Sequence, residues 1–117
     1  MTLTQADLSQ FTGTHLYYTH GLSKHFLYTE GVQYVARTGQ AYWLLDAIAS
    51  VIICKPRVAR QPFQVWTLTV KNKRGTLRCE DGNGKVVYRQ VVPYTDFPLE
   101  SMTFYYENSV LCLPSER

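Results

Sequence analysis

A long apolar run is the first thing that this sequence lacks. No stretch of its 117 residues approaches the roughly 18 consecutive apolar side chains of a membrane-spanning helix. The N-terminal segment MTLTQADLSQ also lacks the basic and apolar regions of a secretory signal peptide. Cysteine is scarce, with three residues far apart, and an odd number of this kind is not a disulfide framework. We therefore expect a cytoplasmic protein that has no membrane partner.

Catalytic signatures are missing as well. The chain contains no G-x-S-x-G, no H-E-x-x-H and no glycine-rich phosphate loop. His15, His20 and His25 recur every five residues, but side chains five apart point in different directions on a strand or a helix. We therefore predict no metal site, no cofactor and no catalytic residue. A small enzyme that uses Asp46 or Cys54 is the least favoured interpretation.

What the sequence has in excess is positive charge in one segment. The net charge is +3, but nine of the twelve Lys and Arg residues lie in residues 55–89. Cations beside exposed aromatic rings are typical of surfaces that bind single-stranded nucleic acid, and aromatic residues make up 14% of this chain. The candidate contact residues are Arg57, Arg60, Lys73, Arg74, Arg78 and Arg89. The alternative is that these charges are solvated and the aromatic rings fill the core.

A short helix between Thr4 and Gly13 is the first that the sequence predicts. Two longer helices follow in the N-terminal half of the chain. Thr29 is a good N-cap for the first of these two, and Gly39 ends it. The second helix covers residues 40–53 and is apolar around most of its circumference, so we expect it to be buried. Only Asp46 and Ser50, one turn apart, interrupt it, and we treat them as pocket candidates. The alternative is that this carboxylate makes a buried hydrogen bond or ion pair that ties the helix to a sheet.

Strands are predicted for nearly everything after Pro62. Runs rich in β-branched and aromatic residues are separated by short turns, which is the pattern of an antiparallel meander. The expected strands cover residues 63–70, 76–80, 85–92, 101–107 and 109–115. The basic segment KPRVARQP before them is predicted to be a loop, because Pro56 opposes a continuing helix. A small hairpin within residues 15–29 is also expected.

These elements predict an α+β fold, an antiparallel β-meander of about five strands with N-terminal helices packed on one face. We expect a single domain over residues 1–117, in which residues 1–54 are mainly helical and residues 62–113 form the meander. The buried helix is expected to pack against Trp66, Leu68, Leu77, Val86, Tyr88, Phe104 and Leu111. The sequence leaves open whether Trp66 and Leu68, or instead Phe63 and Val65, point inward.

The stretch CEDGNGKVV resembles a calcium loop at first sight. Asp81 fits the first ligand position, but Lys85 occupies the third, where a cation opposes binding. A hairpin turn explains the same residues better. It pairs Glu80 with Lys85 and places Arg78 and Arg89 on one polar face. We therefore predict a turn and no calcium site.

The segments LYTEGVQYVARTGQAYWLLDAIAS, PFQVW, CEDGNGK, YTDFPLE and LPSER together resemble a small bacterial domain family of unknown function, associated with cyanobacterial genomes and mobile elements. The resemblance implies one free-standing domain and no particular reaction. The leading functional interpretation is a non-enzymatic binding or regulatory module that contacts nucleic acid through a basic sheet face. The alternative is a protein–protein interaction or inhibitor module of a mobile element, with a homo-oligomer as one form of it.

Overall fold

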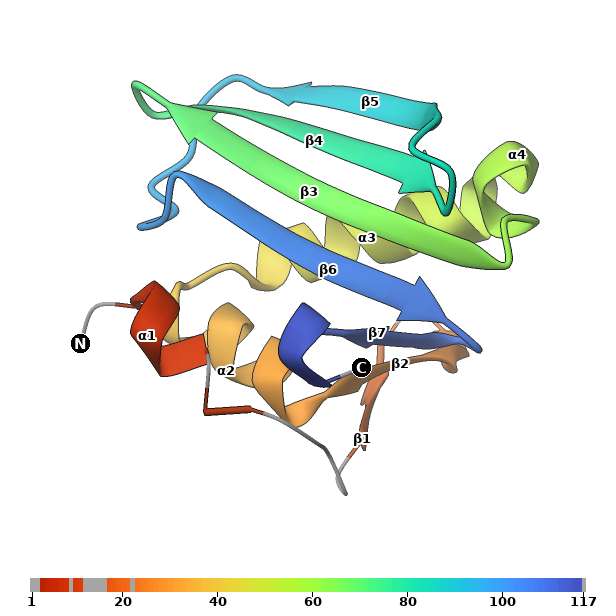
Figure 1. Cartoon of the computed structure of the whole chain (residues 1–117), viewed down its shortest axis with the longest axis horizontal. Coiled ribbons are helices and arrows are strands. Elements are labelled where there is room, and N and C mark those ends of the chain that lie inside the picture. Colours follow the sequence, from red (N-terminus) through yellow and green to blue (C-terminus); the bar gives the residue numbers. More distant parts are fainter. Residues whose placement is uncertain (1–2, 9, 12–16, 22, 117) are drawn as a thin grey trace.

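A single sheet of seven strands organises the described part of the chain (Figure 1). The computed structural model describes residues 3–8, 10–11, 17–21 and 23–116. The strands are β1 Tyr17–His20, β2 Ser23–Thr29, β3 Phe63–Lys71, β4 Arg74–Asp81, β5 Val86–Val92, β6 Ser101–Glu107 and β7 Val110–Cys112. The helices are α1 Gln5–Leu8, α2 Glu30–Thr38, α3 Tyr42–Cys54 and α4 Pro56–Ala59, with a 3-10 turn, η1, at Pro114–Glu116.

The α+β class is confirmed, but the strand count and the strand order differ from the predicted meander. The order across the sheet is β1-β2-β7-β6-β3-β4-β5, and β2 and β7 run parallel while every other neighbouring pair is antiparallel. The hairpin of β1 and β2 lies within the N-terminal part expected to be mainly helical, and it joins the sheet. The chain also crosses from β5 to place β6 beside β3. Residue patterns identify strands, but they do not name the partner of each strand.

The helices α2 and α3 lie behind the sheet in Figure 1 and cover what we call the inner face. Trp66 and Leu68 point to this face and are completely buried, which resolves the ambiguity left by the sequence. Their neighbours Leu77 and Phe104 are buried with them, as predicted. Val86 was expected in the same core, and this prediction is wrong because its side chain is 43% exposed.

Local signals explain the helices. Thr29 caps α2 through a hydrogen bond that its side chain accepts from the Val32 N–H, and the Gly39 N–H closes the other end on the Val35 carbonyl. The predicted loop at KPRVARQP is wrong in part, because Pro56 begins the single helical turn α4. Proline is tolerated there, since the first N–H of a helix has no intrahelical acceptor.

A buried polar network links α4 to the centre of the sheet. Gln64 is fully buried, and its Nε2 donates to the Val58 carbonyl at 2.8 Å. The Trp66 Nε1 donates to Gln64 Oε1, also at 2.8 Å. One glutamine therefore satisfies the indole of the largest core side chain and fixes α4 against β3.

The C-terminal turn η1 is held against the start of α2 by the Glu116 carboxylate. Thr29 Oγ1 and the Leu113 N–H donate to Glu116 Oε1 at 2.6 and 3.0 Å, and the Gly31 N–H donates to Oε2 at 3.1 Å. A negative charge is favourable at a helix N-terminus, where backbone N–H groups lack partners. A Cβ at position 31 would lie 2.5 Å from Glu116 Oε1, so a larger residue there would displace this carboxylate.

Replacing Glu116 by Ala removes all three hydrogen bonds and leaves part-buried donors unpaired. We expect the free energy of unfolding to fall by about 1–3 kcal/mol, measured by urea denaturation. Glu100→Ala is the matched control, since Glu100 is an exposed carboxylate in the loop between β5 and β6. Equal stability of the two variants would contradict the role assigned to Glu116.

Candidate functional site

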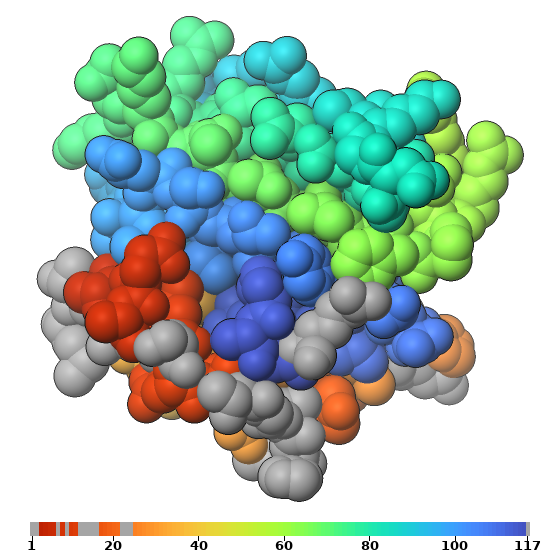
Figure 2. Space-filling model, viewed as in Figure 1, coloured from red at the N-terminus to blue at the C-terminus, as the bar shows by residue number. Residues whose placement is uncertain are grey.

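The face of the sheet opposite α3, which we call the outer face, is only partly covered. Figure 2 shows α1 and the C-terminal segment lying over its lower part, while the strands β3, β4 and β5 are uncovered by other described elements. Alternation along each strand puts polar, charged and β-branched side chains on this face. They include Val65, Thr67, Thr69, Lys71, Arg74, Thr76, Arg78, Glu80, Arg89, Val91, Thr103, Tyr105 and Glu107.

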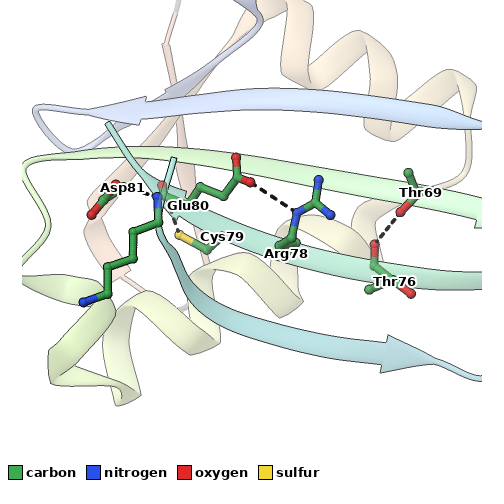
Figure 3. Close-up of polar contacts among 7 residues, drawn as sticks. Thr69, Thr76, Arg78, Cys79, Glu80 and Asp81 are labelled. Atoms are coloured by element: carbon green, nitrogen blue, oxygen red, sulfur yellow. Dashed lines mark hydrogen bonds and ion pairs between the residues drawn. The ribbon is translucent and has the colours of Figure 1, made fainter. Parts of the chain in front are cut away.

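Two arginines stand directly opposite each other on β4 and β5, the two strands at one edge of this face. The register of β4 and β5 pairs Arg78 with Arg89, and Thr67 of β3 lies on the other side of Arg78. The Arg78 side chain is 40% exposed, and its Nε lies 3.5 Å from Glu80 Oε1 without forming a hydrogen bond (Figure 3). Like charges directly opposite on neighbouring strands are destabilising, and the ion pair with Glu80 offsets part of this repulsion at Arg78.

A second cationic pair closes the hairpin between β3 and β4. Lys71 is paired with Arg74, and both side chains are exposed. The two turn residues Asn72 and Lys73 have φ of 53° and 61°, the left-handed backbone that a tight two-residue hairpin requires. Arg74 and Arg78 are four residues apart on β4, so both pairs lie on the outer face.

An aromatic pair lies toward the other end of the same face. Tyr105 is opposite Val65, and Phe63 is two residues from Val65, so both rings belong to the outer face. Their centroids are 5.3 Å apart with the planes inclined at 56°. Both side chains are partly exposed.

The six predicted contact residues are divided by the structure. Arg74, Arg78 and Arg89 share the outer face. Lys73 lies in the hairpin turn, with its Nζ 3.6 Å from Asp96 Oδ1 and 5.9 Å from the centre of the Tyr94 ring.

Arg57 and Arg60 lie on or next to α4, which packs on the helical side of the sheet through Val58. Lys71 belongs to the basic segment, but it is not among the six candidate contact residues. The two-residue turn NK places Lys71 and Arg74, on either side of it, opposite each other.

The pocket candidates Asp46 and Ser50 are also separated. Asp46 Oδ1 accepts a hydrogen bond from His20 Nε2 at 2.8 Å, which ties α3 to β1. Asp46 is 65% exposed and lines a hollow, whereas Ser50 is exposed outside that hollow. The carboxylate is therefore paired, as the alternative interpretation held, but it is not buried.

A turn follows β4, as predicted, but β4 and β5 pair in a different register from the expected one. Asp81 Oδ1 accepts hydrogen bonds from the Asn83 and Lys85 N–H groups at 2.8 and 3.0 Å. These bonds hold the pKa of the Asp81 carboxyl below its usual value. An irregularity pairs Glu80 with Val86, so the expected Glu80–Lys85 pair is wrong. The extra residue turns Val86 outward and explains its exposure.

The thiols of Cys79 and Cys54 lie in different surroundings. Burial raises the pKa of the Cys79 thiol to about 12, and Glu80 and Asp81 add to the shift, so this thiol stays protonated and inert at neutral pH. Cys54 is exposed at the end of α3. Among the described residues no group of three His, Cys, Asp or Glu side chains is placed to hold a metal, and His15 lies outside those residues.

These features define a class of small α+β domain in which helices cover one side of the sheet and leave a cationic area of the other side open. The chain belongs to the family described as "Family of unknown function (DUF6876)", whose model matches residues 2–117. Comparisons with curated proteins and with solved structures give no match. In the part of the chain that the structure describes, the helices are too short or too polar to span a membrane.

Because the Arg78–Arg89 pair is repulsive, removing one charge should stabilise the domain. We expect Arg89→Gln to raise the free energy of unfolding by about 0.2–1 kcal/mol at low salt, while Arg89→Lys leaves it nearly unchanged. The gain should vanish near 0.5 M NaCl, where the screening length is only about 4 Å. Urea denaturation at both salt concentrations measures this. A loss of stability in Arg89→Gln at low salt would show that the pair is not repulsive.

Proposed function

We propose that this domain binds single-stranded nucleic acid on its outer face. The observation that carries the proposal is the Arg78–Arg89 pair, on the two strands at the edge of a sheet face that is only partly covered. A phosphate group between the two guanidinium groups converts their repulsion into two favourable charge-assisted contacts. The destabilisation that this pair causes in the free protein is then explained by its role in binding.

The spacing of the two cationic pairs favours a chain of phosphates over a single anion. Arg74 and Arg78 are four residues apart on one strand, so their Cα atoms are about 13 Å apart. One phosphate does not bridge that distance. A ligand that contacts both the Lys71–Arg74 pair and the Arg78–Arg89 pair therefore carries at least two negative groups.

The aromatic pair favours a single strand over a duplex. Bases that are not paired have open faces, which stack on aromatic rings such as those of Phe63 and Tyr105. In a duplex those faces are already stacked on neighbouring bases. Hydroxyl groups of Thr67 and Thr103 lie on the same face, between the aromatic and cationic residues, and supply further hydrogen-bond donors.

The test compares two double variants that change the charge by the same amount. The Arg78→Ala and Arg89→Ala variant removes the Arg78–Arg89 pair from the outer face. The Arg57→Ala and Arg60→Ala variant removes two cations from the helical side. Binding to labelled single-stranded and duplex oligonucleotides is measured by fluorescence anisotropy at roughly 50 and 200 mM salt. We expect the first variant to bind about tenfold or more weakly and the second to stay close to the wild type.

The aromatic contribution is tested in the same titration. Tyr105→Leu should weaken binding of the single strand by about tenfold and leave duplex binding unchanged, because a lost stacking partner costs about 1–3 kcal/mol per base. Absence of binding by the wild type at the lower salt concentration would refute the proposal. Equal losses in the two double variants would also refute it, because general charge alone would then explain binding.

A second candidate is a protein-binding edge. In the described part of the chain β5 is the last strand of the sheet, and it pairs only with β4. Its residues Val86 and Val91 are 43% and 46% exposed. An open strand edge with exposed apolar side chains is a site for strand addition from another chain.

The partner that the edge fits most simply is a second copy of the domain. If the β5 edge binds a second copy, sedimentation velocity over a wide concentration range should show a monomer–dimer equilibrium that Val91→Lys abolishes. The variant Tyr94→Lys, which changes an exposed residue outside β5, is the control. A wild-type protein that stays monomeric throughout would remove this candidate.

A further inference from the structure

The hollow that Asp46 lines is on the helical side of the sheet, where β1 and β2 meet the first turns of α3. Its volume is about 390 Å³, and it is open to solvent. The lining residues are His20, Gly21, Tyr28, Tyr42, Leu45 and Asp46. The hollow shares no residue with the cationic and aromatic residues of the outer face.

The acidic group of this hollow is held in place from one side. An ionised carboxylate only accepts hydrogen bonds, so His20 donates its Nε2 proton to Asp46 Oδ1 at 2.8 Å. The His20 ring is 8% exposed and packs edge-on against Phe26, with ring centroids 5.5 Å apart. Asp46 has no other partner among the described residues, and its side chain is 65% exposed. The carboxylate is thus oriented by a fixed donor and still available to a ligand.

Tyrosine rings form the walls beside this carboxylate. Tyr28 and Tyr42 line the hollow, and Tyr18 stacks on Tyr28 with a centroid distance of 5.6 Å and an interplanar angle of 19°. Tyr42 is 44% exposed, so packing in the core does not explain the position of its ring. Burial raises the pKa of the Tyr28 phenol, and Tyr42, Tyr18 and Asp46 add to the shift, so Tyr28 is neutral at physiological pH.

We propose that this hollow binds an organic ammonium ion, with the positive group beside Asp46 and the alkyl groups against Tyr28 and Tyr42. Electron-rich ring faces next to a carboxylate attract such cations. An anion is disfavoured because none of the described residues that line the hollow is Lys or Arg. A metal ion is disfavoured because the described residues offer no third ligand. A neutral ligand would desolvate the carboxylate without compensating its charge.

The test uses two probes that differ only in charge. Choline carries a trimethylammonium group, and 3,3-dimethylbutan-1-ol is its neutral carbon isostere. Each is titrated into the full chain while backbone amide shifts are followed by NMR. We expect choline to bind about tenfold more tightly than the alcohol, since a cation–π contact and an ion pair together contribute roughly 1–2 kcal/mol. The shifts should gather around residues 20, 42 and 46.

Three variants locate the contact. Asp46→Asn should abolish the preference for choline, and Tyr42→Leu should weaken choline binding. Ser50→Ala should do neither, because Ser50 lies one turn farther along α3 and does not line the hollow. Tyr42 is exposed, so its replacement keeps the test valid even if Asp46→Asn proves unstable by circular dichroism.

Equal binding of the two probes would overturn the proposal, and so would the absence of choline binding by the wild type. Choline binding that survives both Asp46→Asn and Tyr42→Leu would also overturn it. A peptide that carries Nε-trimethyllysine shows the source of the cation. Tighter binding of the peptide than of choline indicates a protein side chain, and the reverse indicates a free small molecule. The Arg78→Ala and Arg89→Ala double variant should bind choline normally, which separates this site from the outer face.

Discussion

The packing of α3 against one face of the sheet is the interaction on which the rest of the structure depends. Ile48 and Leu44 of the helix are fully buried, as are Trp66 and Leu68 of β3. Because α2 and α3 cover this side, while α1 and the C-terminal segment cover only the lower part of the other, the sheet is amphipathic rather than buried on both faces. The outer face is therefore free to carry residues that packing does not select, and the Arg78–Arg89 pair lies there. The same helix brings Asp46 to His20, so both candidate sites follow from one packing arrangement.

Hydrogen bonds of buried and part-buried polar side chains add to this packing. Gln64 connects the indole of Trp66 with the carbonyl of Val58 and holds α4 against the sheet. Glu116 joins the last turn of the chain to the first turn of α2. The Glu116 contacts join residues 87 and 85 positions apart in the sequence, so they close a part of the fold that the apolar core alone would leave less defined.

Sequence patterns predicted the elements better than their arrangement. The Thr29 cap, the Gly39 end and the apolar period of the second helix are local signals, and they correctly placed α2 and α3. The five strands after Pro62 were also found. The parallel pairing of β2 with β7 was missed because strand partners are chosen by long-range packing. The irregularity near Val86 was missed because one extra residue in a strand leaves no distinctive composition.

The sequence by itself determined the class of fold, the central helix, and the concentration of positive charge in one segment. It does so because capping, apolar period and composition are properties of neighbouring residues. Only the tertiary structure decided which cations act together. Register placed Arg78 opposite Arg89 and Lys71 opposite Arg74, while the turn α4 moved Arg57 and Arg60 to the other side. It also joined His20 to Asp46 across 26 residues, a contact that depends on how β1 docks beside α3 and that no local pattern encodes.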